Sequence, residues 1–210
     1  MRVVILGAGG HGQVVADILW CMQRAGMDIL PAAFLDDDPA QRGQNYLGVP
    51  VCGVTADLAA IAHEAVIVAI GNGRVRQRLF LEMQARGEQL AIAQHPTAVL
   101  AEGVQVGAGS MIAANVVVNT GSVIGQNVIL NTACTVDHHN RIGDHAHIAP
   151  GAHLGGDVRV GEGTLIGIGA VVLPQRRVGD WATVGGGAVV VRDVGAGETA
   201  VGNPARSSKK

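Results

Sequence analysis

Residues 160–178 read VGEGTLIGIGAVVLPQRRV, and every sixth residue of this stretch, starting with the first, is valine or isoleucine. The same spacing continues in both directions and places sixteen aliphatic residues in succession from Leu100 to Val190. An amphipathic helix has apolar residues three and four positions apart, so a period of six excludes it. The period instead predicts a β-helix, in which each short strand points one aliphatic side chain inward.

Three six-residue sides close one coil of 18 residues, so the repeat predicts about five stacked coils, about 24 Å long at the spacing of hydrogen-bonded strands. Each coil packs only against its neighbours, as in other solenoid proteins. The aromatic content of 2% suits so narrow an interior. Val116, Val128 and Val158 lie outside the period-six column, and we expect them at the surface, where a partner covers them.

The first 95 residues alternate strand-like apolar runs with helical periodicity. Strands are expected at residues 2–6, 29–35, 65–70 and 90–93, with helices after the first and third. This alternation predicts a parallel sheet that binds ligands at the carboxyl ends of its strands. Because Pro96 interrupts both patterns, we predict an α/β domain at 1–95 and a β-helix domain at 96–210.

The first expected strand ends in Gly7-Ala8-Gly9-Gly10-His11-Gly12, which matches G-x-G-x-x-G and precedes a helical pattern. Backbone N–H groups at such a helix start bind phosphate. A dinucleotide site also needs an acidic residue downstream, and Asp36 is available, but about 95 residues are too few for a two-halved dinucleotide sheet. We therefore expect a mononucleotide-type domain. The alternative is that the glycines only make a tight strand-to-helix turn.

The composition narrows the class of protein and its location. A formal net charge of −2 and a pI near 6.4 favour neither nucleic acid nor an anionic membrane as a partner. The sequence shows no long apolar span and no signal-peptide pattern, which predicts a cytoplasmic protein. Cys21, Cys52 and Cys134 are odd in number and widely spaced, so we expect small core residues rather than disulfides or a zinc site.

Most of the histidines cluster around the sequence DHHNRIGDHAH, which starts at Asp137. His138 has an adjacent carboxylate, Asp137, which can orient one ring nitrogen and raise the basicity of the other. We expect the remaining corner histidines, His139, His145 and His153, to have no catalytic role. A catalytic metal is the competing hypothesis, because hexapeptide-repeat carbonic anhydrases hold zinc with three histidines, but their ligand spacing is not found in this sequence.

Seven motifs together resemble one family: GAGGHG, FLDDD, AIGNG, NTACTVDHHNRIGDHAHIAPGAHLGG, LIGIGAVVLP, VGGGAVVVRDV and VGNPAR. This combination resembles the sugar O- and N-acetyltransferases that carry a small nucleotide-sugar-binding domain before a left-handed β-helix, and it covers nearly the whole chain. The resemblance implies the fold class: an α/β Rossmann-like N-terminal domain followed by a left-handed parallel β-helix. It also implies a homotrimer with acetyl-CoA between neighbouring β-helices.

The resemblance assigns expected roles to individual residues of the β-helix. The general base falls on His138, with Asp137 as its partner, although some family members have Glu at the position of His139. Contacts to acetyl-CoA fall on His147, Ile168 and Gly186. No metal is expected.

In the N-terminal domain, the contacts to the nucleotide-linked sugar fall on two glycine turns, one histidine and two acidic residues: Gly9, Gly10, His11, Asp36, Asp37 and Gly71. The resemblance implies acetyl-CoA-dependent N-acetylation of a nucleotide-linked 4-amino-4,6-dideoxy sugar in bacterial surface-glycan synthesis. Two alternatives remain at this point: an O-acetyltransferase of the sialic acid type, and a non-catalytic nucleotide-binding trimer. The sequence does not identify the nucleotide base.

Overall fold

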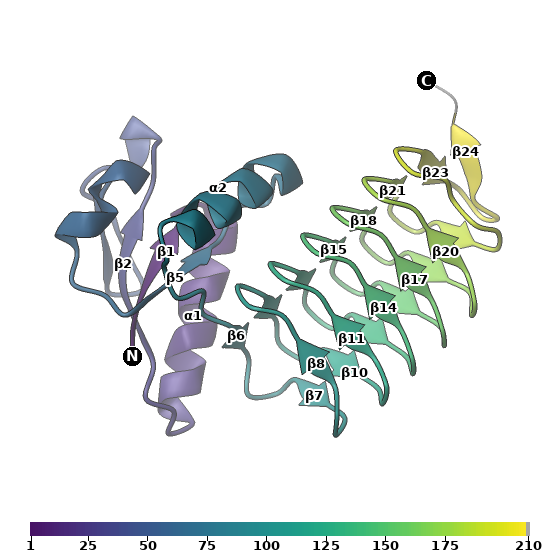
Figure 1. The fold of residues 1–210 in the computed structure, drawn as a ribbon, viewed down its shortest axis with the longest axis horizontal. Helices are drawn as coiled ribbons and strands as arrows, with labels where there is room; N and C mark the ends of the chain where they lie inside the picture. The colour runs from purple at the N-terminus through teal and green to yellow at the C-terminus, as the bar shows by residue number, and fades with distance from the viewer. Residues whose placement is uncertain (209–210) are drawn as a thin grey trace. The chain divides into compact units, whose positions relative to one another are not determined.

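The computed structural model describes residues 1–208 and divides the chain into two compact units, one spanning Met1–Pro96 and the other starting at Thr97. Figure 1 shows an α/β unit at the N-terminus and a stack of flat coils in the rest of the chain. None of the described helices is long and apolar enough to cross a membrane.

The first unit contains a five-stranded sheet in the order β3-β4-β2-β1-β5, parallel except for the antiparallel pair β3 and β4. Its strands are β1 (Arg2–Leu6), β2 (Leu30–Leu35), β3 (Asn45–Tyr46), β4 (Val49–Gly53) and β5 (Ala65–Val68). Its helices are α1 (Gly10–Arg24) and α2 (Gly73–Ala85), with short 3-10 turns η1 (Pro39–Gln41) and η2 (Thr55–Ala60), and a last short strand is β6 (Ala93–Gln94).

The core of this unit lies on both faces of the sheet. Val4 and Leu6 of β1 belong to a buried cluster with Leu79 and Phe80 of α2. Residues that alternate with them along β1, such as Ile5, point to the other face and are also fully buried. Because both faces are covered, β1 is apolar at every position from its second residue on.

Two details of the expected strand pattern are wrong. Residues 90–93 do not form one continuous strand; Leu90 makes a single bridge to Val66, and Ala93 begins the separate short strand β6. The hairpin of β3 and β4 was not expected, because its turn is made by Leu47 and Gly48, both with positive φ (55° and 80°). Leucine is not a residue that marks such a turn in a sequence.

A very short contact connects β1 to α1. A Cβ added at Gly12 would lie 1.9 Å from the carbonyl oxygen of Gly7, so no side chain fits there. Gly7 itself has φ +109°, which only glycine adopts readily. These two glycines therefore allow the helix to start directly against the end of the strand.

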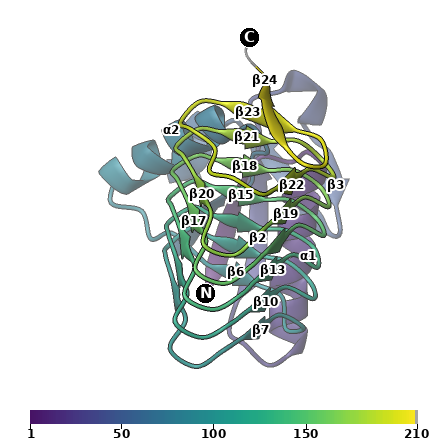
Figure 2. The same cartoon turned by 90° about the vertical axis from the view of Figure 1, so that its right-hand side faces the viewer.

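The second unit is a parallel β-helix built mainly of two-residue strands, seen from the side in Figure 1 and obliquely from its C-terminal end in Figure 2. Three sheets run along it, here called the first, second and third sheet. The first sheet contains β7 (Val99–Leu100), β10 (Val117–Val118), β13 (Thr135–Val136), β16 (His153–Leu154), β19 (Val171–Val172) and β22 (Val189–Val190). The second contains β8 (Gln105–Val106), β11 (Val123–Ile124), β14 (Arg141–Ile142), β17 (Arg159–Val160) and β20 (Arg177–Val178). The third includes β9 (Met111–Ile112), β12 (Ile129–Leu130), β15 (His147–Ile148), β18 (Leu165–Ile166), β21 (Thr183–Val184), β23 (Thr199–Val201) and the antiparallel β24 (Arg206–Ser208).

The period-six column fills the interior as predicted. From Ile112 to Val190 every member is between 0 and 3% exposed, and only Leu100 and Val106 of the first coil are partly open. Strands pair in register with the strand 18 residues away, for example Val118 with Val136. Each residue therefore lies directly above its counterpart in the preceding coil.

The surface position expected for Val116, Val128 and Val158 is wrong, since all three are 0% exposed. They occupy the position four residues after a column member, which in most other coils holds a small or polar residue (Ser, Ala, Thr, Cys or Asn) that is buried at a corner. The exposed apolar residues of the β-helix are others, notably Val99 (61%) and Ile168 (67%). Any partner surface must therefore be built from these and not from the three valines.

The close approach at Gly12 gives a direct test of the first unit. We expect Gly12→Ala to destabilise the protein by at least about 2 kcal/mol, although alanine is the better helix former, because the added methyl group meets backbone. Gly10→Ala is the matched control, because a Cβ there has no atom within 4 Å. Urea unfolding of both variants checks this, and equal midpoints would contradict it.

Candidate active site

The glycine loop leaves the start of α1 open. The helix has no side-chain cap at Gly9 and no acidic residue in its first turn, whereas Asn72 caps α2 by accepting from the N–H groups of Arg74 and Val75. A Cβ at Gly9 or Gly10 would meet nothing within 4 Å. The first turn of α1 therefore offers backbone donors and free space for an anion.

His11 is partly buried and lies near a buried cation, Arg76. Arg76 is 1% exposed and donates from Nη1 to the carbonyl oxygens of Ile70 (3.1 Å) and Gly71 (3.4 Å). Burial, and then the charge of Arg76, lower the pKa of His11 to about 4. His11 is therefore neutral near pH 7, and its buried Nε2 has no hydrogen-bond partner among residues 1–208.

The acidic loop after β2 is tied to the glycine loop. Asp36 accepts hydrogen bonds from the N–H groups of Ala8 (2.7 Å) and Asp38 (2.9 Å), and Asp37 accepts from that of Thr55 (2.8 Å). Asp36 is therefore a structural link between β1 and β2, whereas the exposed Asp37 keeps its second carboxylate oxygen towards solvent.

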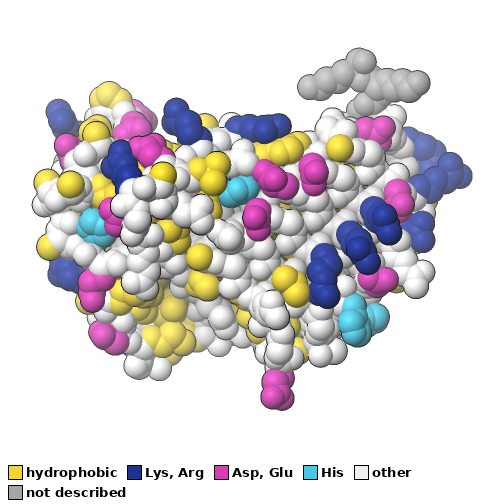
Figure 3. All heavy atoms as spheres, viewed as in Figure 1, with side chains coloured by type: hydrophobic (Ala, Val, Ile, Leu, Met, Phe, Trp, Pro, Cys, Tyr) yellow, Lys and Arg dark blue, Asp and Glu magenta, His cyan; other side chains and the backbone are white. Residues whose placement is uncertain are grey.

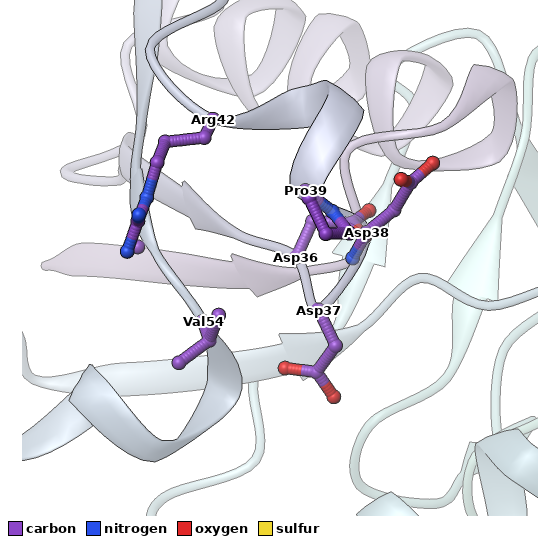
Figure 4. Close-up of a pocket in the computed structure, with 7 residues that line it drawn as sticks. Asp36, Asp37, Asp38, Pro39, Arg42 and Val54 are labelled. Atoms are coloured by element: carbon purple, nitrogen blue, oxygen red, sulfur yellow. The ribbon is translucent and has the colours of Figure 1, made fainter.

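Two small cavities open at this edge of the sheet. One, of about 150 Å³, is lined by Asp36, Asp37, Asp38, Pro39, Arg42, Gly53 and Val54 (Figure 4). The other, also about 150 Å³, lies at the ends of β1, β2 and β5 and is lined by Gly7, Leu35, Asp36, Asp37, Thr55, Ile70, Val75, Arg78 and Leu79. The structure thus brings the predicted N-terminal site residues to one edge, at the carboxyl ends of β1, β2 and β5.

His138 lies exposed at the corner between β13 and β14. Asp137 does not orient its ring: Asp137 Oδ1 accepts from the backbone N–H of His138 (2.8 Å) and from Asn119 Nδ2 (2.9 Å). These hydrogen bonds, with Asn119 first, lower the pKa of Asp137. The carboxylate therefore holds the backbone of the corner, and its charge acts on His138 without direct ring contact.

The ring of His138 has a different partner, His139. Their Nδ1 atoms are 3.0 Å apart, and the rings are nearly perpendicular, at 77°. On its other side, the His138 ring lies against Gly156 of the next coil, where an added Cβ would be 2.5 Å from Cε1 and Nε2. The side chain as a whole is exposed, and Nε2 forms no hydrogen bond with any other described residue.

Two buried residues that sequence reasoning missed hold this corner in place. Asn140 is 0% exposed and donates from Nδ2 to the carbonyl oxygens of Asp137 (2.7 Å) and Gly155 (2.9 Å). Ser122 donates to the same Asp137 oxygen (2.8 Å) and accepts from the backbone N–H of Asn140 (3.1 Å). The sequence does contain a signal for both residues. Each is a polar residue four positions after a column member, at a position where the side chain is buried.

The three residues expected to contact acetyl-CoA lie on one side of the β-helix. His147 starts β15 in the third sheet, and its Nε2 is 3.2 Å from Asn131 Nδ2. Ile168 follows β18 and is 67% exposed; a Cβ at Gly186 would be 3.3 Å from the Ile168 oxygen, since the two residues stack in adjacent coils.

Within one chain, His138 and His147 do not come together. His138 occupies the corner between the first and second sheets, and His147 projects outward from the third sheet, because its neighbour Ile148 is the buried column member. In a three-sided coil, the third side lies opposite that corner (Figure 2). The two histidines therefore face in opposite directions.

The other corner histidines have structural partners in the preceding coil. His145 Nδ1 is 2.8 Å from Asn127 Nδ2, and His153 Nδ1 is 2.9 Å from Thr135 Oγ1. Among the described residues, no three His, Cys, Asp or Glu side chains converge as metal ligands. Of the three cysteines expected in the core, Cys134 is buried, but Cys21 is only partly buried and Cys52 is exposed, so the expectation is wrong for these two. Burial raises the pKa of the Cys134 thiol to about 12, so it is no nucleophile.

A column of positive charge starts one strand after His138. Arg141, Arg159 and Arg177 are the first residues of β14, β17 and β20, and they pair directly across the second sheet. All three are exposed, and Figure 3 shows a diagonal row of Lys and Arg side chains on the β-helix. Such a column can attract an anion that lies along the axis.

The lowered pKa of His11 makes stability depend on pH. Between pH 6.5 and about 4 the unfolded chain binds a proton that the folded chain does not, so stability falls as the pH is lowered through this window. The change amounts to at most on the order of 3 kcal/mol. We expect His11→Gln to lose less stability than the wild type between pH 7 and 4.5 in urea unfolding; identical losses would contradict the burial of a neutral His11.

Comparison with known proteins relates both units to transferases. Residues 2–83 match the family model of the PglD N-terminal domain, and residues 157–192 match that of the bacterial transferase hexapeptide (six repeats). The chain is 34% identical over 214 residues to the GDP-perosamine N-acetyltransferase of Escherichia coli O157:H7, covering 98% of this chain and 96% of that protein.

Solved structures share the whole fold. PerB from Caulobacter crescentus, in complex with CoA and GDP-perosamine, is 38% identical with a TM-score of 0.91 and covers 100% of this chain and 98% of its own. The acetyltransferase domain of PglB from Neisseria gonorrhoeae FA1090, in complex with acetyl coenzyme A, is 37% identical with a TM-score of 0.90 and covers 99% and 98%. The expected Rossmann-like domain and left-handed parallel β-helix are thereby confirmed. This chain belongs to the family of sugar N-acetyltransferases that join a PglD-type N-terminal domain to a hexapeptide-repeat β-helix.

Proposed function

We propose that this protein transfers the acetyl group of acetyl-CoA to the amino group of a nucleotide-linked 4-amino-4,6-dideoxy sugar, in the cytoplasm, for bacterial surface-glycan synthesis. The observation that carries the proposal is the exposed His138 at a rigid corner, with its Nδ1 hydrogen-bonded to His139. The free state of Cys21, Cys52 and Cys134 supports a reducing compartment.

The chemistry assigned to His138 is that of a general base. A sugar ammonium group cannot attack until it loses a proton, so the amine must be deprotonated before or during attack. The neutral nitrogen then bonds to the thioester carbonyl carbon and becomes positively charged. His138 Nε2 takes one proton from this nitrogen, and the C–S bond breaks. The proton passes to the departing thiolate, which leaves as CoA. A positioned base contributes about 10²–10⁴-fold, and the alignment of both substrates contributes further.

The N-terminal unit serves as the site for the nucleotide. The first turn of α1 with Gly9 and Gly10 would hold the diphosphate, with His11 as a neutral donor and buried Arg76 adding positive potential. Gly71 provides space at the end of β5. Asp37, which has a free carboxylate oxygen beside the cavity of Figure 4, would accept from the base. We favour a GDP-linked sugar, because the full-length relative in Escherichia coli is named GDP-perosamine N-acetyltransferase and PerB is in complex with GDP-perosamine.

The acetyl-CoA site requires a second chain. His138 and His147 face in opposite directions, so both can reach one thioester only if they come from neighbouring chains. We therefore propose a homotrimer in which His138 of one β-helix faces His147, Ile168 and Gly186 of the next. The exposed side chain of Ile168 would then be covered, and the arginine column at Arg141 would lie along the CoA phosphates.

Two further functions are outcomes of the same test. The base that deprotonates an amine also serves a hydroxyl group, which is what a sialic acid-type O-acetyltransferase needs. A non-catalytic nucleotide-binding trimer would bind the nucleotide sugar and transfer nothing.

The test is an acetyl-transfer assay with GDP-, UDP- and dTDP-linked 4-amino sugars and matched hydroxyl sugars. We expect the amino sugars to be acetylated, and the GDP-linked amino sugar most efficiently. In His138→Ala and His138→Asn, turnover should fall by about 10²-fold or more while acetyl-CoA binding is kept. Transfer to hydroxyl sugars alone would show an O-acetyltransferase instead. The absence of any transfer would favour the non-catalytic nucleotide-binding trimer.

The assembly is tested separately by sedimentation. We expect one species of three times the 21.4 kDa chain mass. In mixtures of His138→Ala and His147→Ala chains, subunit exchange should restore activity, because some sites then combine an intact His138 with an intact His147 from another chain. A concentration-independent monomer with full activity would contradict the shared site.

A further inference from the structure

We infer that His139 is a positioning residue that fixes the tautomer of His138, so that the lone pair of His138 is presented at Nε2. The inference rests on the proposed function, because it assigns His138 as the base. It revises the expectation that His139 has no catalytic role. His139 occupies the place where some family members have Glu, so it supplies an acceptor of a different kind.

The geometry of the two rings is that of a hydrogen bond. The Nδ1 atoms are 3.0 Å apart, and the ring centroids are 5.2 Å apart, only 2.2 Å further. Both nitrogens therefore lie between the two ring centres and point towards each other. Because two protons or two lone pairs would repel at this distance, the contact carries one proton.

Only one placement of that proton makes His138 a base. If His138 donates from Nδ1, its Nε2 holds a lone pair towards the substrate. After Nε2 takes a proton, His138 is a cation that still donates to the neutral His139, so the hydrogen bond becomes charge-assisted. If His139 were the donor, proton uptake would place two N–H groups against each other. An acceptor role for His139 therefore suits His138 both before and after its Nε2 takes a proton.

The surrounding packing keeps both rings in place. His139 has φ +60°, which directs its side chain back over its neighbour. Its ring lies against Gly121 in the preceding coil, where an added Cβ would be 2.7 Å from Cδ2. The His138 ring lies against Gly156 in the next coil. Neither glycine leaves room for a side chain without moving a histidine.

Three charged residues lie next to this pair: Asp137, Arg141 and Asp157. Asp137 holds the backbone N–H of His138, and its negative charge favours the cation that forms there. Arg141 donates to the carbonyl oxygen of Gly121 (2.8 Å), next to the His139 ring. Asp157 of the next coil donates its backbone N–H to the carbonyl oxygen of His138 (2.9 Å).

The test uses two substitutions that suit a positive φ, so that the backbone is not the variable. His139→Gly removes the acceptor, and His139→Asn keeps one, because Asn Oδ1 occupies about the place of Nδ1. We expect kcat to fall about 10-fold or more in the glycine variant, with both KM values within about 2-fold of wild type, and to recover in the asparagine variant. Equal activity in wild type and the glycine variant would overturn the inference, and so would an asparagine variant as weak as the glycine variant.

A second measurement does not depend on turnover. Side-chain ¹⁵N NMR of the histidines distinguishes the Nδ1–H and Nε2–H tautomers of neutral His138. We expect Nδ1–H in the wild type and in His139→Asn, and mainly Nε2–H in His139→Gly. An Nε2–H tautomer in the wild type would overturn the inference even if the enzyme is active. A wild type with Nδ1–H and no transferase activity would instead overturn the proposed function alone.

Discussion

The interior column of aliphatic side chains is the constraint on which the rest of this structure depends. One inward residue every six positions fixes the length of each side, and three sides fix an 18-residue coil whose strands pair in register. Because a one-residue slip would turn the column outward, the register is strongly specified. Residues far from the column are therefore positioned by it, including every corner and every outward side chain.

The candidate site follows from this stacking. His138 touches Gly156, and His139 touches Gly121, because each glycine lies one coil away from its histidine. Asn140 occupies the buried corner position and uses it to bind two carbonyl oxygens, which keeps the backbone rigid below the exposed rings. A catalytic group at a corner is thus held by residues that the repeat itself places there.

In the N-terminal unit a different constraint positions the candidate ligand site. The contact of Gly12 with Gly7 brings the start of α1 against the end of β1, and Asp36 ties the next loop to it. The result is a row of open backbone donors above a neutral His11 and a buried Arg76. Rigid glycine turns and buried polar groups position the ligand in this unit, as stacked coils do in the other.

The sequence by itself determined the β-helix, its coil length, the parallel α/β unit and the histidine cluster, because a strict period and a glycine loop are local patterns. The tertiary structure alone decided what each side chain touches: it gave His138 the partner His139 instead of Asp137, and it buried Val116, Val128 and Val158. It also placed His138 and His147 on opposite sides of the coil. Contacts across a corner and between coils join residues whose spacing alone does not fix ring orientation, so no pattern along the chain reports them.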